Sequence, residues 1–198
     1  MEFIINIAGL TIKVNSMYIA VYRKCKGFIS DPAVKADISV GTTMAQLQAD
    51  NNRLWAETGE GTVFWNLECL AVHRQITEAF LEHDTLLIHG AAIAYDGGAY
   101  LFCAPSGTGK TTHIRLWLEN LPEAYVVNGD KPFLRLTENG VLVCGSPWCG
   151  KENLGTNTMV PLKAVIFMER SERNHIQGVP FGKSFLYTVQ MLNLQMEL

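Results

Sequence analysis

Residues 101–112 read Leu-Phe-Cys-Ala-Pro-Ser-Gly-Thr-Gly-Lys-Thr-Thr, and this stretch decides the interpretation of the chain. Its apolar first part predicts a strand, its glycines predict a turn, and a helix is expected over residues 110–120. Glycines let the backbone turn its N–H groups inward, so that several donors converge on one anion. The start of the helix adds its positive end. The arrangement predicts a loop that holds the phosphates of a nucleotide.

The residues of this loop have separate expected roles. Lys110 would bridge the β- and γ-phosphates, and the hydroxyl of Thr111 would hold Mg²⁺. Ala104 stands where the strict pattern begins with glycine, and its small side chain is compatible with the turn. The alternative is a glycine-rich turn that binds nothing. The nucleotide-binding residues expected from the sequence are Ser106, Gly107, Thr108, Gly109, Lys110, Thr111 and Thr112.

A second magnesium ligand is expected on the next strand. Residues 125–130 read Tyr-Val-Val-Asn-Gly-Asp and end in a carboxylate at the edge of the expected sheet. Such a carboxylate holds Mg²⁺ in many phosphate-loop proteins, so Thr111 and Asp130 are the expected metal ligands. The alternative is a purely structural aspartate, because Asn-Gly-Asp-Lys-Pro is also a good turn sequence.

The segments around the loop predict an α/β or α+β domain from about residue 84 onward. Short apolar runs at 86–88, 125–127 and 164–168 predict single strands. Glycine-containing turns separate paired runs, which predicts two hairpins, one over 91–103 and one over 133–144.

The earlier part of the chain predicts a small β-rich region. Apolar residues alternate with polar ones between residues 5 and 14, and residues 18–22 and 36–40 predict two more short strands. An apolar stripe with helical spacing predicts a helix over residues 67–83, with Asn66 as its cap. We therefore expect a β-rich part over residues 1–66 and a nucleotide-binding, kinase-like domain over residues 67–198.

Composition excludes several classes of protein. Hydrophobic residues make up 48% of the 198 residues, which argues against disorder, and the formal charge of −3 argues against a nucleic-acid surface. No apolar run reaches the roughly 18 residues that a membrane span needs. The first 16 residues open with an acid and alternate, unlike a signal peptide. Five cysteines without a CxxC pair do not indicate disulfides or a zinc site, so a cytoplasmic protein is expected.

These residues also resemble a known family. The run 106–112 is similar to the phosphate loop of ATP-dependent phosphoenolpyruvate carboxykinases. The wider order resembles the catalytic domain of HPr kinase/phosphorylase and its smaller relatives: His89-Gly90 after a strand, a hairpin, the loop, then an Asp-bearing turn at 128–130. The resemblance covers about residues 84–170. It implies an α/β P-loop domain with a mixed sheet and flanking helices, and ATP and Mg²⁺ as cofactors.

The chain departs from the family at three places. Pro105 stands where HPr kinase/phosphorylases have the aspartate that serves as acid and base for phosphate transfer to and from serine. Gly129 precedes Asp130 where the family often has paired acids. The 198-residue chain continues for only thirty residues after Met168, so we expect the family's carboxy-terminal portion to be shortened.

Further side chains are candidates for the chemistry. The resemblance implies that His89 acts as a base or orients the γ-phosphate; the alternative is a histidine that closes a buried strand. Residues 145–152, Gly-Ser-Pro-Trp-Cys-Gly-Lys-Glu, are unusually apolar for a loop. There, Lys151 could neutralise the transferring phosphoryl group, Glu152 could bind a metal or accept a proton, and Trp148 could stack on a base. The alternative puts Trp148 in the core and both charges in solvent.

Two arginines, Arg170 and Arg173, follow the last expected strand. They could reach phosphates, although surface charges are the simpler interpretation.

The sequence therefore predicts an ATP-dependent serine kinase, resembling HPr kinase, that transfers the γ-phosphate to a serine-type hydroxyl of a peptide or small protein. The expected catalytic residues are Lys110, His89, Asp130 and Glu152. Two alternatives stay open: a nucleotide-binding regulatory module without turnover, favoured by Pro105, and a small-molecule kinase. The expected partners are the nucleotide and a peptide or small-protein acceptor, and the resemblance is compatible with a homo-oligomer.

Overall fold

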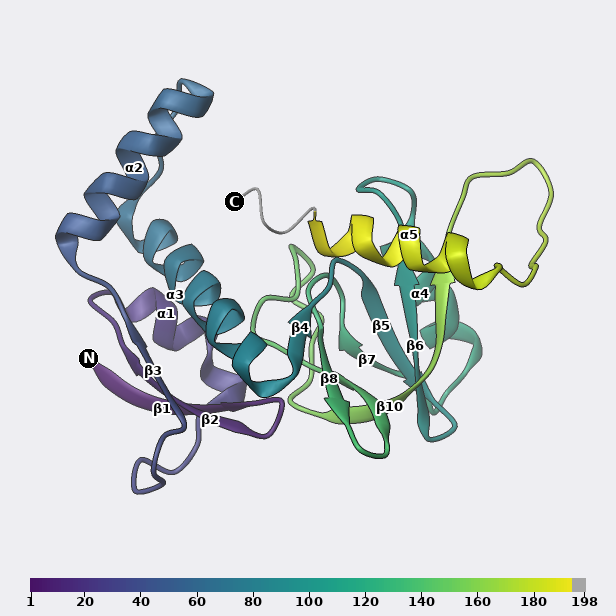
Figure 1. The fold of residues 1–198 in the computed structure, drawn as a ribbon, viewed down its shortest axis with the longest axis horizontal. Helices are drawn as coiled ribbons and strands as arrows, with labels where there is room; N and C mark the ends of the chain where they lie inside the picture. Colours follow the sequence, from purple (N-terminus) through teal and green to yellow (C-terminus); the bar gives the residue numbers. More distant parts are fainter. Residues whose placement is uncertain (194–198) are drawn as a thin grey trace. The chain divides into compact units, whose positions relative to one another are not determined.

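The computed structural model describes residues 1–193 and divides the chain into two compact units, Met1–Asp84 and a second unit that begins at Thr85. Figure 1 follows the chain through both units. The division differs from the boundary expected after residue 66. The helix over Phe64–Phe80, which spans this point, packs against the helices and strand of the first unit and therefore belongs to it.

The first unit contains a three-stranded sheet in the order β1-β2-β3. Strands β1 (Glu2–Ile7) and β2 (Leu10–Asn15) form the antiparallel hairpin that the alternating pattern predicts, and β3 (Ile38–Gly41) pairs with β2 in parallel. The strand expected over residues 36–40 is thus confirmed as β3.

Three helices complete the first unit: α1 (Ile19–Lys24), α2 (Met44–Thr58) and α3 (Phe64–Phe80), with short 3-10 turns η1 (Lys26–Phe28) and η2 (Leu81–His83). The strand expected over 18–22 is wrong, because this segment starts α1. The buried carboxylate of Glu68 accepts the backbone N–H groups of Met17 and Tyr18 at 2.6 and 2.9 Å, and a carboxylate stabilises a helix start. Helix α3 has Val63 rather than Asn66 as its N-cap.

The second unit contains a seven-stranded mixed sheet in the order β4-β8-β9-β10-β6-β5-β7. Its strands are β4 (Thr85–Leu87), β5 (Ala91–Tyr95), β6 (Gly98–Cys103), β7 (Tyr125–Asn128), β8 (Phe133–Thr137), β9 (Gly140–Cys144) and β10 (Met159–Phe167). The two expected hairpins, β5–β6 and β8–β9, are confirmed. The fold is therefore mixed α/β, as expected from the sequence.

Strand β10 is longer than predicted, because it serves two neighbours in turn. Its first residues pair antiparallel with β9, and its later residues pair in parallel with β6. The register shifts between Leu162 and Ala164, where the strand changes partner. Parallel pairing makes β6 and β10 run in the same direction, so both strands end at the same edge of the sheet.

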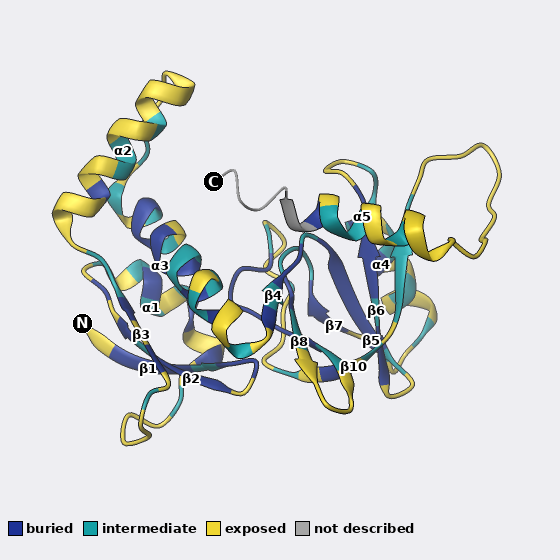
Figure 2. Ribbon diagram, in the orientation of Figure 1, coloured by how far each residue is buried: buried dark blue, intermediate teal, exposed yellow. Residues whose placement is uncertain are grey.

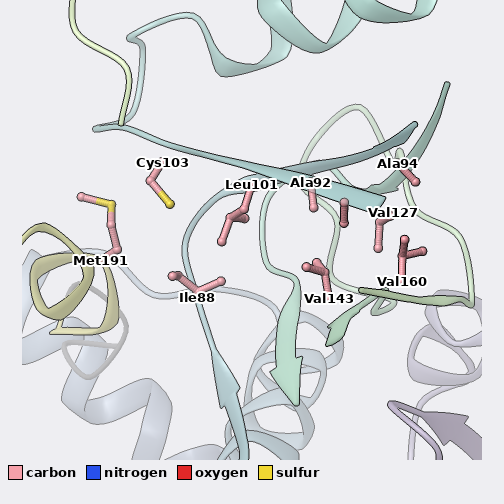
Figure 3. Packing of buried hydrophobic residues seen from close by; sticks show 10 residues of the cluster. Ile88, Ala92, Ala94, Leu101, Cys103, Val127, Val143, Val160 and Met191 are labelled. Carbon is pink, nitrogen blue, oxygen red and sulfur yellow. The ribbon is translucent and has the colours of Figure 1, made fainter. Parts of the chain in front are cut away.

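Helices α4 (Lys110–Asn120) and α5 (Phe181–Asn193) pack on opposite faces of this sheet. Alternate residues of β6 divide between two core clusters: Leu101 and Cys103 join the cluster that includes Met191 of α5, while Phe102 joins the cluster that includes Ile114 of α4. Figure 3 shows Met191 next to Ile88 and Cys103. The sequence pattern predicts α4, whereas no helix is predicted where α5 forms.

Burial follows this layering. Figure 2 shows β5, β6 and β7 largely buried, β8 and β10 with many intermediate or exposed residues, and the segment between β10 and α5 exposed. Among residues 1–193, no helix is both long and apolar enough to cross a membrane.

Candidate functional site

The pairing of β6 with β10 places two loops side by side. Cys103 at the end of β6 lies opposite Phe167 of β10, and the N–H of Met168 donates to the Cys103 carbonyl at 2.9 Å. The glycine-rich loop leaves the sheet after Cys103, and the segment that contains Arg170 leaves after Phe167. In α/β sheets, the edge where parallel strands end is the usual place for a ligand.

The glycine-rich loop has the backbone conformation that its glycines predict. Gly107 and Gly109 have φ angles of 78° and 112°, in the left-handed region that other residues rarely adopt. Gly109 is the N-cap of α4, so the first N–H groups of the helix face the loop. Ser106 and Gly107 are exposed, and Thr111 is half-buried. The loop and the first turn of α4 thus offer backbone donors and a hydroxyl at an accessible surface.

Lys110 points back into this loop. Its side chain is one of the buried polar groups, with the residue only 9% exposed. Its Nζ donates to the carbonyls of Ala104 at 2.7 Å and Pro105 at 3.5 Å, and lies 3.2 Å from Nε2 of His89. The ammonium therefore sits at the entry of the loop.

His89 and Asp130 come from two further segments and meet beside Lys110. His89 follows β4, and Asp130 follows β7. The His89 Nε2 lies 3.8 Å from Oδ1 of Asp130, and the N–H of Gly90 donates to the Asp130 carbonyl at 3.0 Å. Three residues that are far apart in the sequence, His89, Lys110 and Asp130, therefore form one cluster, which we call the loop-entry cluster.

Burial and neighbouring charges shift the pKa values of the two basic groups in the loop-entry cluster. Burial and the neighbouring Lys110 ammonium lower the pKa of His89 below its usual value, while Asp130 acts in the opposite direction. Burial also lowers the pKa of Lys110, against the opposing charge of Asp130. Burial thus disfavours the charged form of both basic groups, and an anion beside them would favour that form. When His89 is neutral, its Nε2 can accept a hydrogen bond from the Lys110 ammonium, and the ring proton is then on Nδ1.

Asn128 fixes the turn that carries Asp130. This fully buried side chain accepts the N–H groups of Asp130 and Lys131 at 2.9 and 2.7 Å. Its Nδ2 donates to the backbone carbonyl and to Oγ of Ser146, at 3.1 and 2.9 Å. In the sequence Asn128 stands out only as part of a turn, although an asparagine in a turn often accepts the backbone N–H two residues later.

The loop over residues 145–156 packs against the same turn. Trp148 is 8% exposed and Cys149 is 4% exposed, so both belong to the core. A side chain at Gly129 would come within 3.2 Å of the Cys149 carbonyl. The burial of Trp148 matches the alternative in which this ring fills the core.

The charged end of this loop is directed elsewhere. Glu152 accepts a hydrogen bond from Nη2 of Arg115 on α4 at 2.7 Å, and both side chains are about half exposed, at 49% and 56%. Lys151 is exposed. The structure thus brings together His89, Lys110 and Asp130, whereas it pairs Glu152 with Arg115.

Arg170 contacts the glycine-rich loop in the structure, which the sequence alone does not predict. Its Nη2 donates to the carbonyl of Gly107 at 2.7 Å, across 63 residues of sequence. Arg173, three residues later, is exposed, and its own N–H donates to Oγ of Ser171. Of the two arginines after β10, Arg170 therefore contacts the glycine-rich loop.

The donors available to a metal are oxygens. Asp130 offers a carboxylate with 31% of its side chain exposed, and Thr111 offers a half-buried hydroxyl. Within residues 1–193, no group of three or more His, Cys, Asp or Glu side chains is arranged to hold a metal ion. A cation here would need further oxygens, which phosphates and water supply to Mg²⁺ in nucleotide sites.

No protein-family model matches this chain, and no curated protein matches it.

Proposed function

We propose that the second unit binds ATP with Mg²⁺ at the glycine-rich loop and transfers the γ-phosphate to a serine-type hydroxyl of a peptide or small protein. The observation that carries the proposal is the position of Lys110: a buried ammonium at the start of a helix, held by the carbonyl of Ala104 within a loop of open backbone donors. Phosphate oxygens would replace that carbonyl as the partner of the ammonium. The resemblance to HPr kinases supports the same assignment.

The loop residues would bind and orient the polyphosphate. The N–H groups of Gly107 and of residues 109–112 would provide hydrogen bonds, and the helix start provides favourable potential for negative charge. Thr111 and Asp130 have the oxygen donors that suit Mg²⁺. The bound ion would offset the charge on the β- and γ-phosphate oxygens. Positioning and charge compensation of this kind supply most of the catalysis in phosphoryl transfer.

His89 is the best placed group to take the proton of the acceptor hydroxyl. Burial and Lys110 lower its pKa, so the ring is neutral near pH 7 and able to accept a proton. Once Lys110 turns to phosphate, Nε2 becomes available. Asp130, 3.8 Å from Nε2, would then stabilise the charged ring. His89 would in this way take the role of the family's aspartate, which Pro105 replaces.

One observation favours the second candidate, a nucleotide-binding module without turnover. Pro105 offers no acid or base, and its carbonyl is occupied by Lys110 and by the N–H of Thr108 at 3.3 Å. Binding without chemistry needs only the loop and Lys110. Turnover with a serine peptide separates the two candidates.

The first experiment is ATP binding by calorimetry, with and without Mg²⁺. Lys110→Ala should weaken binding by about 2 kcal/mol or more, because it removes charged hydrogen bonds to phosphate. The matched control is Lys163→Ala, which removes the same charge from β10 at a half-exposed position paired with Asp96. Equal binding by Lys110→Ala and wild type would exclude the loop as the phosphate site.

A second experiment tests transfer itself. Wild type and His89→Gln are incubated with ATP labelled on the γ-phosphate and a serine-containing peptide. We expect label on the peptide with wild type and a loss of about 100-fold or more with His89→Gln. ATP binding without any transfer to peptides would favour the binding module.

A further inference from the structure

We infer that Arg170 is a phosphate-binding residue, whose guanidinium binds oxygens of the polyphosphate chain held by the glycine-rich loop. The inference rests on the proposed nucleotide site and adds a residue to it. Arg170 comes from a different segment than the loop, and it lies beside the loop because β10 and β6 are parallel and end together.

The hydrogen bond to Gly107 places the guanidinium at the loop. Gly107 lies within the loop's exposed, left-handed turn, three residues before Lys110. The bond from Nη2 to its carbonyl is 2.7 Å long. A guanidinium has five N–H donors in a planar fork, so it can hold this carbonyl and still bind phosphate oxygens through its remaining donors.

The contact also changes the charge that the loop presents to a phosphate. A backbone carbonyl that faces a phosphate repels it, and the Gly107 carbonyl lies in the loop that we expect to bind phosphates. The guanidinium of Arg170 covers that carbonyl with a positive group. The loop would then present two cations, Lys110 and Arg170, to the polyphosphate. Arginine is the side chain best suited to bidentate binding of phosphate.

The neighbouring carboxylate does not compete for this position. Glu169 accepts a hydrogen bond from Oη of Tyr187 on α5, at 3.4 Å. Successive residues after β10 are therefore directed to different partners, Glu169 to α5 and Arg170 to the loop. The orientation leaves the positive charge of Arg170 at the loop.

The test separates phosphate binding from a purely structural bond to Gly107. Arg170→Gln keeps an amide N–H that can donate to the Gly107 carbonyl, but removes the charge. Arg170→Lys keeps the charge but not the fork, and Arg170→Ala removes both. Arg173→Ala is the matched control, an exposed arginine in the same segment. Affinities for ATP and for inorganic tripolyphosphate are measured by calorimetry in parallel with Lys110→Ala.

We expect Arg170→Ala and Arg170→Gln to weaken both ligands by about tenfold or more, Arg170→Lys to lie between them and wild type, and Arg173→Ala to change little. Wild-type affinity in Arg170→Gln would show that the arginine only supports the loop and would overturn the inference. Weakened ATP with unchanged tripolyphosphate would mean that Arg170 contacts the base, and would also overturn it.

The same measurements distinguish failure of this inference from failure of the proposed nucleotide site. If wild type binds both ligands in a Lys110-dependent way while Arg170→Ala matches wild type, the inference fails and the proposed function stands. If wild type binds neither ligand, both fail.

Discussion

The two loops that flank the Asp130 turn look equally unusual in sequence but differ in the structure. The loop over residues 104–109 is exposed from Pro105 to Gly107, and its carbonyls accept hydrogen bonds from the side chains of Lys110 and Arg170. The loop over residues 145–156 is buried from residue 145 to 149 and is bonded to the turn through Asn128. The first loop offers open donors to a ligand, whereas the second uses its groups internally.

This difference shows what makes a loop a binding site. An apolar run with tryptophan and cysteine attracts attention in a sequence, yet such residues are also those that fill cores. Free backbone N–H groups beside a buried cation are the better indicator, because they can still form bonds with a ligand. The predictions below test this contrast.

The largest expected effect is on the stability of the buried loop. Trp148→Ala should lower the free energy of unfolding by about 3–5 kcal/mol, as for other large core side chains. Trp148→Phe should lose less and should bind ATP as wild type does, because the ring faces the core. Urea unfolding and calorimetry measure these effects. The control is Trp65→Ala, which removes a ring that is 49% exposed and should cost about 1 kcal/mol or less.

If Trp148→Phe folded normally but bound ATP much more weakly, the ring would contact the nucleotide. The contrast between the two loops would then be wrong.

The next effect concerns the bond between the buried loop and the Asp130 turn. Asn128→Ala leaves the half-buried N–H groups of Asp130 and Lys131 without their side-chain acceptor, which should cost about 1–3 kcal/mol. Ser146→Ala keeps that acceptor and removes only the Ser146 hydroxyl, which accepts from Nδ2 of Asn128 and donates to the Lys131 carbonyl. Urea unfolding of both variants should show a smaller loss of unfolding free energy for Ser146→Ala. Equal losses would place the stabilising bonds on the Ser146 side.

Local patterns explain which parts of the fold the sequence predicts. The hairpins, α4 and the glycine-rich loop depend on periodicity and turn residues that lie within a few positions of one another. The local pattern of residues 18–22 predicts a strand, whereas helix α1 forms there with its start stabilised by Glu68, about 50 residues away in the sequence. Helix α2 is polar over most of its length, with Leu47 buried and Leu54 partly buried, so its apolar pattern is weak, although the capping box of Thr43 and Gln46 marks its start.

The same difference between local patterns and contacts of residues distant in sequence applies to the candidate site. Lys110 and the loop could be predicted from one continuous stretch, and Asp130 from the strand that follows. The contact between Arg170 and Gly107 could not, because it depends on the parallel pairing of two strands that are distant in sequence. The pairing of Glu152 with Arg115 could not be predicted either, because Arg115 lies 37 residues away on a different element.

A smaller effect is expected from the lowered pKa of His89, beside the exposed glycine-rich loop. Its pKa should lie below the usual 6.5, because burial and Lys110 disfavour the charged ring. The unfolded chain then binds more protons between the two pKa values, so the free energy of unfolding should fall as the pH falls below about 6.5. Proton NMR titration of the ring measures the pKa directly.

Variants of Lys110 and Asp130 test the direction in which each charge shifts the pKa of His89. Lys110→Ala removes a positive charge and should raise the His89 pKa, whereas Asp130→Asn should lower it further. Tripolyphosphate should raise it in wild type, because an anion stabilises the charged ring. A pKa that ignored all three changes would place His89 outside the loop-entry cluster.

The smallest expected effect is at the charged end of the buried loop. Glu152→Gln breaks the pair with Arg115, in which both side chains are about half exposed, and pairs of this kind contribute about 1 kcal/mol or less. Arg115→Gln should cost the same, and the double variant should cost little more, because each single change already removes the interaction. Urea unfolding at low and high salt measures the three.

The same variant tests the catalytic role that the sequence predicts for Glu152. A carboxylate that accepts the proton of the hydroxyl would contribute about 100-fold or more to the rate of transfer. Because Glu152 is bonded to Arg115 whereas His89 lies beside Lys110, we expect Glu152→Gln to retain transfer within about threefold and His89→Gln to lose it. The reverse result would make Glu152 the base, and would require its loop to leave Arg115 and close over the phosphates during the reaction.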